Sequence, residues 1–201
     1  HAEALMKNVT RVAVGAGSGL GLAWAEVSSS NGINTISSHD TEGGHIDFAP
    51  TSSTQIQLLQ FLHERFGHVS YERILSGEGM VSLYRFCSGE DVRGLDAEWV
   101  NNHSDIDEAA ERALSLFVEI YGAYIGNIAL MFKPLGGIYI TGGIAAKIEN
   151  KMRSKAFIEA YLDKGRMRTL VEQIPVYLVT NERVGVIGAI SEAIKQLRAA
   201  R

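Results

Sequence analysis

Cysteine and proline are scarce in this sequence of 201 residues, and their scarcity excludes several classes of protein. Cys87 is the only cysteine, so the chain can form no internal disulfide and no zinc site built from clustered cysteines. Only three prolines are present and 46% of the residues are apolar, which is typical of a folded chain rather than a disordered one. A reducing, cytoplasmic location is the default expectation.

Basic runs and long apolar runs are missing as well. The formal net charge is −4 and no cluster of lysine and arginine suggests a nucleic-acid partner or a membrane surface. We find no apolar stretch long enough to cross a bilayer and no signal-peptide pattern at the start, so no membrane partner is expected. The chain opens on His1 rather than methionine, and we interpret it as a piece of a longer protein.

Glycine is abundant, and a glycine at every second position follows a predicted strand at residues 11–14. Gly15, Gly17 and Gly19, with Ser18 between them, belong to a loop whose amides can face phosphate oxygens. The spacing fails the dinucleotide fingerprint, and no Gly-Lys-Ser/Thr follows, so the Walker loop is excluded too. A phosphate loop of another kind and a plain glycine-rich hairpin both remain open.

The next segment predicts two more strands. Apolar stretches at residues 22–28 and 33–37 flank Asn31-Gly32, the strongest short signal for a hairpin. The glycine loop therefore joins antiparallel strands. Residues 2–8 resemble the last turns of a helix that precedes the first strand.

The stretch Glu42-Gly43-Gly44-His45 combines two flexible positions with two polar side chains. A tight turn there could aim Glu42 and His45 into one pocket. A carboxylate accepts hydrogen bonds and an imidazole can donate or accept, a combination that suits a ligand with several hydroxyl groups. The alternative is an ordinary surface turn.

Capping signals predict the helices of the middle of the chain. Ser52 or Ser53 caps a helix over 54–66 that ends at Gly67, with Ile56, Leu59, Phe61 and Leu62 on its apolar stripe. A short helix capped by Ser70 would close at Gly77, with Glu72 in its first turn. The helix dipole stabilises a carboxylate at that position, so Glu72 could occur there without binding a ligand. The remaining predicted helices lie at residues 80–87 and, capped by Asp105, at 106–132.

The last third alternates strands and helices. A buried strand at 137–140 leads into Thr141-Gly142-Gly143, and a glycine pair between a strand and a helix is where α/β folds admit nucleotides. A second strand at 175–179 precedes a closing helix at 184–197, in which Gly185 and Gly188 suggest tight packing. We predict one α/β domain: three antiparallel strands, then alternating helices and strands in one mixed sheet.

Five of these stretches together resemble bacterial-type glucokinase, in order and over nearly the whole chain: residues 15–21, 42–45, 70–77, 141–144 and 185–189. The resemblance implies an actin-like ATPase (ribonuclease H-like) architecture of two domains that close over a cleft. It also implies phosphorylation of the glucose 6-hydroxyl by ATP with Mg²⁺, in the cytoplasm, by a homodimer.

The resemblance assigns roles residue by residue. Glu42, His45 and Glu72 match sugar-hydroxyl ligands, and no metal ligand falls in this chain. The nucleotide is assigned to residues that match the second phosphate loop and the adenosine motif of the family: Gly15, Gly17, Ser18, Gly19, Gly142 and Gly143.

Two family motifs have no counterpart here. An Asp-x-Gly-Gly-Thr phosphate loop and an Asn-Asp pair, whose aspartate is the catalytic base, are both absent from residues 1–201. We therefore expect this chain to be the large, C-terminal domain, with the small domain and catalytic aspartate outside it, and to be inactive alone. The alternatives are a non-catalytic sugar-binding regulator and a structural actin-like module. A related branch with a cysteine-rich zinc site is excluded, because Cys87 stands alone.

Overall fold

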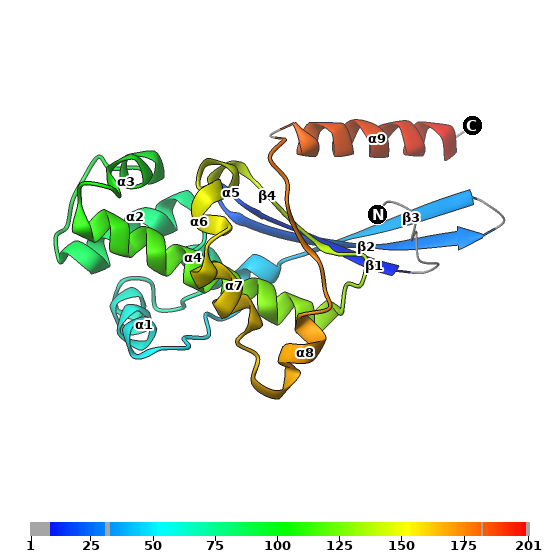
Figure 1. Ribbon diagram of the computed structural model, residues 1–201. Coiled ribbons are helices and arrows are strands. Elements are labelled where there is room, and N and C mark those ends of the chain that lie inside the picture. Colours follow the sequence, from blue (N-terminus) through cyan, green and yellow to red (C-terminus); the bar gives the residue numbers. More distant parts are fainter. Residues whose placement is uncertain (1–8, 31–32, 182, 200–201) are drawn as a thin grey trace.

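The computed structural model describes residues 9–30, 33–181 and 183–199, and a five-stranded sheet lies at its centre (Figure 1). The strand order is β3-β2-β1-β4-β5. The first three strands are antiparallel, whereas β4 pairs with β1, and β5 with β4, in parallel. The predicted mixed α/β sheet is confirmed, with strands β1 (Val9–Ala16), β2 (Leu20–Ser30), β3 (Ile33–Thr41), β4 (Ile138–Thr141) and β5 (Val176–Leu178).

Helices follow the strands in two groups. Between β3 and β4 lie α1 (Ser53–Phe66), α2 (Gly77–Ser88), α3 (Ala97–His103) and α4 (Glu108–Phe132), with short 3₁₀ turns η1 (Gly43–His45) and η2 (Tyr71–Arg73). Beyond β4 lie α5 (Gly143–Lys147), α6 (Glu149–Met152), α7 (Lys155–Leu162), η3 (Gly165–Met167), α8 (Arg168–Val171) and, after β5, α9 (Val184–Ala199).

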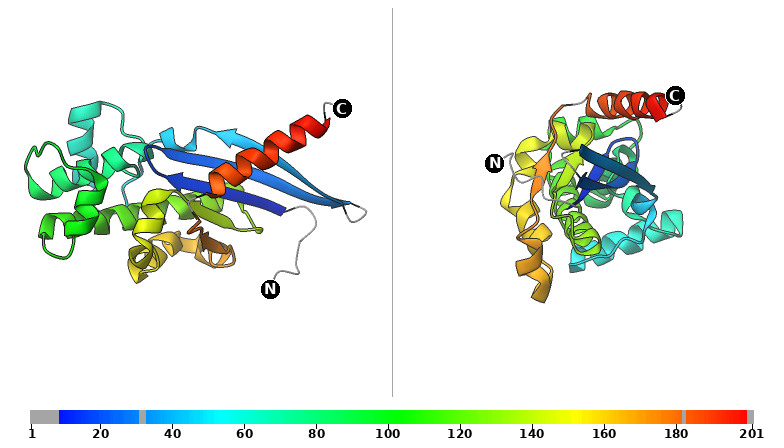
Figure 2. Two further views of the ribbon diagram at one scale, coloured as in Figure 1. Left: turned by 90° about the horizontal axis from the view of Figure 1, so that it is seen from above. Right: turned by 90° about the vertical axis from the view of Figure 1, so that its right-hand side faces the viewer.

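Helix α4 forms the core beneath the sheet. Side chains of alternate β1 residues, Val12, Val14 and Ala16, are buried on the same side as the rows of apolar α4 side chains. Figures 1 and 2 show α4 and α7 on one face of the sheet and α9 on the other. One face of the sheet therefore packs against the core. This packing fixes the positions of the ends of β1, β2 and β3 relative to α4.

Helix α4 is also long and apolar enough to cross a membrane, by length and composition only. The expectation that no stretch reaches that length is wrong on this point. However, 72% of the relevant window is buried inside the fold, so α4 is the core helix of this domain.

The start of α4 differs from the prediction by two residues. Asp107, not Asp105, is the N-cap, and its carboxylate accepts a hydrogen bond of 2.9 Å from the Ala110 amide. Ile106 lies in the preceding turn and is 83% exposed. Asp107 also accepts from the Tyr84 hydroxyl at 3.1 Å, a tertiary contact that local capping rules do not include.

Two glycines on α4 allow close contact with α7. A Cβ on Gly122 would lie 2.4 Å from the Phe157 carbonyl oxygen, and one on Gly126 would lie 2.5 Å from that of Tyr161. Neither backbone could remain in place with a side chain there. The close approach of α4 and α7 therefore requires glycine at both positions.

Around Gly77 the prediction was wrong. The segment after Ser70 forms only the 3₁₀ turn η2, and Ser70 makes no side-chain capping bond there. Gly77 instead begins α2, whose N-cap Ser76 accepts from the Gly79 amide at 3.1 Å. A Cβ on Gly79 would lie 2.2 Å from the Ile74 carbonyl oxygen. The tight turn between η2 and α2 therefore requires glycine at position 79, in the first turn of α2.

The predicted apolar stripe of α1 is confirmed at three of its four positions: Leu62 is buried, and Leu59 and Phe61 pack against the core. Ser52 caps this helix and Gly67 ends it, as expected. The buried positions, however, are Gln55, Leu58 and Leu62, whereas Ile56 is 50% exposed. Gln55 is buried because its side-chain oxygen accepts from the Thr51 amide and hydroxyl, at 2.9 and 3.1 Å.

Helix α9 lacks the tight packing that its glycines suggested. A Cβ on Gly185 or Gly188 would meet nothing within 4 Å among the described residues. The helix contacts the sheet through Lys195, whose Nζ donates to the Ile36 carbonyl at 3.0 Å. The predicted helix at residues 2–8 and the turn at Asn31-Gly32 lie outside the described residues.

Candidate active site

The Glu42-Gly43-Gly44-His45 turn is bound tightly to the start of β2. The Thr41 hydroxyl donates to the Leu22 carbonyl at 2.9 Å and accepts from the Gly43 amide at 3.1 Å. A Cβ on Gly44 would lie 2.0 Å from the Leu20 carbonyl oxygen. The glycines are therefore needed for contact with β2, and this contact sets where Glu42 and His45 project.

Glu72 reaches the same place from η2. A short β-bridge joins Asp47 to Ser70, and the Tyr71 amide donates to the Ile46 carbonyl at 3.1 Å. These bonds hold η2 beside η1. The Glu72 Oε2 atom accepts a hydrogen bond of 2.8 Å from the Leu20 amide at the start of β2.

The three predicted sugar ligands lie together at this edge. His45 Nε2 is 3.6 Å from Glu42 Oε2 and 3.8 Å from Glu72 Oε1. Their side chains are 57%, 90% and 31% exposed, respectively. The cluster is thus open to a ligand, and its carboxylate and imidazole groups can bind several hydroxyl groups at once.

A buried polar support under both turns was missed in the sequence. The Tyr124 hydroxyl, on α4, donates to the Gly43 carbonyl at 2.9 Å. The Tyr71 ring lies 4.5 Å from that of Tyr124, and the Tyr71 hydroxyl accepts from Asn127 Nδ2 at 3.0 Å. Burial raises the pKa of both tyrosines, so each keeps its proton. A tyrosine and an asparagine three residues apart on α4 are the only sequence signal of this support.

The glycine loop between β1 and β2 is largely bonded to the protein itself. The Gly17 amide donates to the Gly19 carbonyl at 2.8 Å, and the Gly77 amide donates to the Gly17 carbonyl at 2.9 Å. Gly15 pairs with Gly21 in the β1–β2 ladder. The predicted phosphate loop is therefore a tight turn, and it presents Ser18 to solvent next to the first residues of α2.

The glycine pair after β4 lies beside this loop. Gly142 has φ of 92°, and a Cβ on it would lie 2.3 Å from the Ala16 carbonyl oxygen, so two features require glycine there. Gly142 and Gly143 start α5 at the carboxyl end of β4.

A cavity of about 210 Å³ joins the two glycine segments. Its wall includes both Gly17 and Gly143, together with side chains from α2, α3, α5 and the start of α6: Met80, Ala97, Glu98, Asn101, Ile144, Lys147 and Ile148. Lys147 and Glu98 form an ion pair of 2.6 Å at its edge. A mostly apolar wall with a few polar groups is typical of a site for a small molecule or cofactor.

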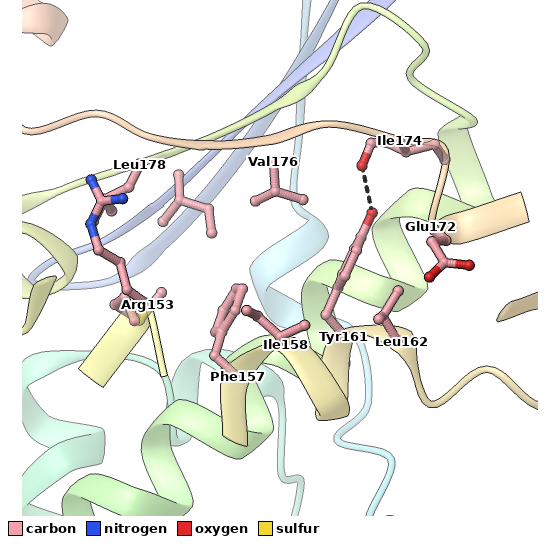
Figure 3. A pocket seen from close by; sticks show the side chains of 11 residues that line it. Arg153, Phe157, Ile158, Tyr161, Leu162, Glu172, Ile174, Val176 and Leu178 are labelled. Atoms are coloured by element: carbon pink, nitrogen blue, oxygen red, sulfur yellow. Dashed lines mark hydrogen bonds between the residues drawn. The ribbon is translucent and has the colours of Figure 1, made fainter. Parts of the chain in front are cut away.

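A second cavity, of about 330 Å³, lies elsewhere, between α7 and strands β4 and β5 (Figure 3). The Tyr161 hydroxyl beside it donates to the carbonyls of Val171 and Ile174, at 2.9 and 3.0 Å. No residue of the predicted site lines this cavity. Its size alone therefore does not make it the candidate active site.

Solved structures of glucokinases have the same fold as this chain. The crystal structure of glucokinase from an Antarctic psychrotroph matches with a TM-score of 0.80 and 30% identity, over 91% of this chain and 57% of that one. Glucokinase from Balamuthia mandrillaris in complex with glucose matches with a TM-score of 0.71 at 19% identity, over 85% and 50%. The predicted actin-like ATPase fold is confirmed.

The family model described as Glucokinase matches residues 2–196, and the chain belongs to the glucokinase family. It is 41% identical to the glucokinase of Photorhabdus laumondii, over 91% of this chain and 57% of that protein, and 40% identical to that of Hahella chejuensis, over 92% and 58%. The chain thus spans somewhat more than half the length of these relatives. The family match does not favour the regulator alternative.

Proposed function

We propose that this chain is the large domain of a two-domain glucokinase that transfers the terminal phosphoryl group of ATP to the 6-hydroxyl of glucose. The main support is the convergence of Glu42, His45 and Glu72 on one exposed edge, together with a cavity of about 210 Å³ lined by Gly17 and Gly143. A ROK family glucokinase from Streptomyces griseus, whose solved structure contains glucose and AMPPNP, has the same fold.

In this proposal the sugar is held by hydrogen bonds from its hydroxyl groups. Glu42 and Glu72 accept these bonds, and His45 donates or accepts, because the imidazole has both capacities. A sugar that lacks a matching hydroxyl leaves a carboxylate or imidazole unpaired, which lowers its affinity. The cluster therefore orients the sugar and selects it.

The nucleotide would place its base in the cavity between α2, α3 and α5. Its phosphates would then extend past Gly142-Gly143 toward the β1–β2 loop and the sugar. In the reaction a bond forms between the sugar O6 and the terminal phosphorus, the bond to the ADP oxygen breaks, and the hydroxyl proton passes to a base. We assign that base to an aspartate outside residues 1–201, in the small domain, since no Asn-Asp pair occurs in this sequence.

The residues described here offer Mg²⁺ no ligand set, because none of their His, Cys, Asp and Glu side chains form a group of three suited to a metal ion. We therefore propose that Mg²⁺ enters with the phosphates of ATP, and we assign no step of this chain to it. A cytoplasmic location and a homodimer are parts of the same proposal.

The test is a coupled assay of glucose 6-phosphate formation by the complete protein, with Glu72→Gln as the main variant. We expect the variant to raise the KM for glucose by about tenfold or more, because it weakens a charged hydrogen bond, with the KM for ATP nearly unchanged. The matched control is Glu64→Gln, on the exposed side of α1, which should leave both values unchanged.

Two outcomes would contradict the proposal. Unchanged glucose affinity in Glu72→Gln would remove Glu72 from the sugar site. Calorimetry that detects no glucose binding to the complete protein would favour the structural module instead.

A third measurement tests the division into domains. Residues 1–201 alone should produce no glucose 6-phosphate, and turnover near that of the complete protein would refute that division.

A further inference from the structure

The Glu72 carboxylate makes two different contacts with its two oxygens. Oε2 accepts the 2.8 Å hydrogen bond from the Leu20 amide, directly after the glycine loop. Oε1 faces His45 Nε2 at 3.8 Å. Because a charge-assisted bond to a backbone amide is directional, the Leu20 amide fixes the orientation of the carboxylate and so directs Oε1 toward the sugar site.

This orientation depends on the absence of a side chain at position 19. A Cβ on Gly19 would lie 2.5 Å from Glu72 Oε2 and 3.3 Å from the carboxyl carbon. Gly19 is not among the glycines with positive φ, so its backbone conformation is open to other residues. The space taken by Glu72, rather than the backbone conformation, is what requires glycine there.

The neighbouring glycine of the same loop provides a contrast. A Cβ on Gly17 would meet nothing within 4 Å. A methyl group at position 17 would therefore leave Glu72 undisturbed, whereas the same methyl group two residues later would displace it. The obstructed atom belongs to the end of a flexible side chain, so Gly19→Ala should move Glu72 without breaking the fold.

We infer that Gly19 is a positioning residue for the sugar site, acting through Glu72, and not a phosphate ligand as its place in the loop suggested. This inference rests on the proposed function, because it concerns how the same site holds its sugar. It also means that the β1–β2 loop and the Glu72 carboxylate move together. A nucleotide that shifts this loop would thereby shift a sugar ligand.

The main experiment measures glucose and ATP affinity of the complete protein by calorimetry. Gly19→Ala should raise the Kd for glucose by about tenfold or more, since the charged hydrogen bond that orients Glu72 is lost. The Kd for ATP should change by less than about threefold. Gly17→Ala is the matched control and should leave glucose affinity within about twofold of the wild type. Equal effects of the two variants on glucose, or an effect of Gly19→Ala on ATP alone, would overturn the inference.

A double-mutant cycle tests whether the effect passes through Glu72. In a Glu72→Ala background the added Gly19→Ala substitution has no carboxylate to displace, so it should change glucose affinity by less than about twofold. Additive losses would mean that Gly19 acts by another route and would overturn the inference. A general loosening of the loop would also persist in this background, so the cycle separates positioning from a structural effect.

A third measurement does not depend on the folding of Gly19→Ala. Hydrogen exchange at the Leu20 amide should be faster in Glu72→Ala than in the wild type, and equal exchange would overturn the inference. The outcomes also separate the two proposals. If wild-type protein binds no glucose, the proposed function fails; if it binds glucose and Gly19→Ala binds it equally well, only the role of Gly19 fails.

Discussion

The Tyr124 hydroxyl donates a hydrogen bond of 2.9 Å to the carbonyl oxygen of Gly43, 81 positions earlier in the chain. Both groups are buried, and the bond joins the core helix α4 to the turn that carries Glu42 and His45. The Tyr71 ring packs on Tyr124 and precedes Glu72. Helix α4 therefore supports both halves of the candidate site from below.

Tyr124→Phe should weaken this support while keeping the ring packing. The variant leaves the buried Gly43 carbonyl without its donor, which costs about 1–3 kcal/mol of unfolding free energy. Glucose affinity should fall several-fold, because the turn that carries Glu42 and His45 is less well fixed. Denaturant unfolding and calorimetry measure the two effects.

The matched control for Tyr124→Phe is Tyr161→Phe. The Tyr161 hydroxyl also donates to buried backbone carbonyls, but it lies beside the cavity between α7 and β5 (Figure 3). This control should lower stability and leave glucose affinity unchanged. If both variants reduced glucose affinity equally, the effect would reflect general destabilisation and not the contact with Gly43.

Ala97→Phe should block the nucleotide cavity. Ala97 lines the cavity of about 210 Å³ together with Met80 and Ile144, and a phenyl ring would occupy much of that volume. We expect the KM for ATP to rise by about tenfold or more, while glucose affinity measured without nucleotide stays the same. The control is Ala23→Phe, at an exposed position of β2, and a matching rise in that control would argue against a nucleotide site at Ala97.

Gly122→Ala should destabilise the domain by about 1–3 kcal/mol, because the new methyl group would overlap the Phe157 carbonyl and force α4 and α7 apart. Helix propensity alone predicts the opposite, a gain of about 1 kcal/mol. Denaturant unfolding decides between them. Ser115→Ala, at a half-buried position on the same helix, should change stability by less than about 0.5 kcal/mol.

Asp107 should make stability depend on pH. Hydrogen bonds from the Ala110 amide and the Tyr84 hydroxyl hold the pKa of this carboxyl below its ordinary value. The pKa is lower in the folded state, so this stabilisation is complete above the unfolded value of about 3.9 and is lost as the pH falls through the folded value. Asp107→Ala should therefore cost about 1 kcal/mol at neutral pH and much less in acid.

The control for Asp107 is Asp107→Asn, which keeps a capping oxygen without a charge. Its stability should lack the acid-dependent part attributed to Asp107. Unfolding by urea at neutral pH and at acid pH measures the difference. An Asp107→Ala deficit that is the same at both would show that the carboxylate does not titrate differently on folding.

Local patterns predicted much of the secondary structure. The strand at residues 11–14, the helix cap at Ser52 or Ser53 and the helix stop at Gly67 depend on neighbours a few residues away; all three are confirmed, with Ser52 as the cap. The errors arose where a tertiary contact overrode the local pattern. Asp107, which accepts a hydrogen bond from Tyr84, is the N-cap of α4 in place of Asp105. Gly77 begins α2, because the chain changes direction at η2 just before it.

In the candidate site, too, local spacing predicted some neighbours and tertiary contacts decided the others. Glu42 and His45 are three positions apart, so a turn was enough to predict that they lie together. That Glu72 joins them was expected from the family resemblance, and the distance of 3.8 Å to His45 agrees with that expectation. The Tyr124 support had only a weak signal, a tyrosine and an asparagine three residues apart on α4. The glycine pair at 142–143 indicated a nucleotide site, but nothing in the local pattern showed that α2 and α3 form the cavity wall beside it.

The order of strands and helices along the chain, the cap at Ser52 and the family of the chain were determined by the sequence itself, because each depends on residue types at short, regular spacings. Only the tertiary structure decided that Gly19 leaves room for Glu72 and that Tyr124 holds Gly43, since those pairs lie 53 and 81 positions apart. Which distant groups meet depends on how α4 packs beneath the sheet. That packing is a property of the whole core and of no single segment.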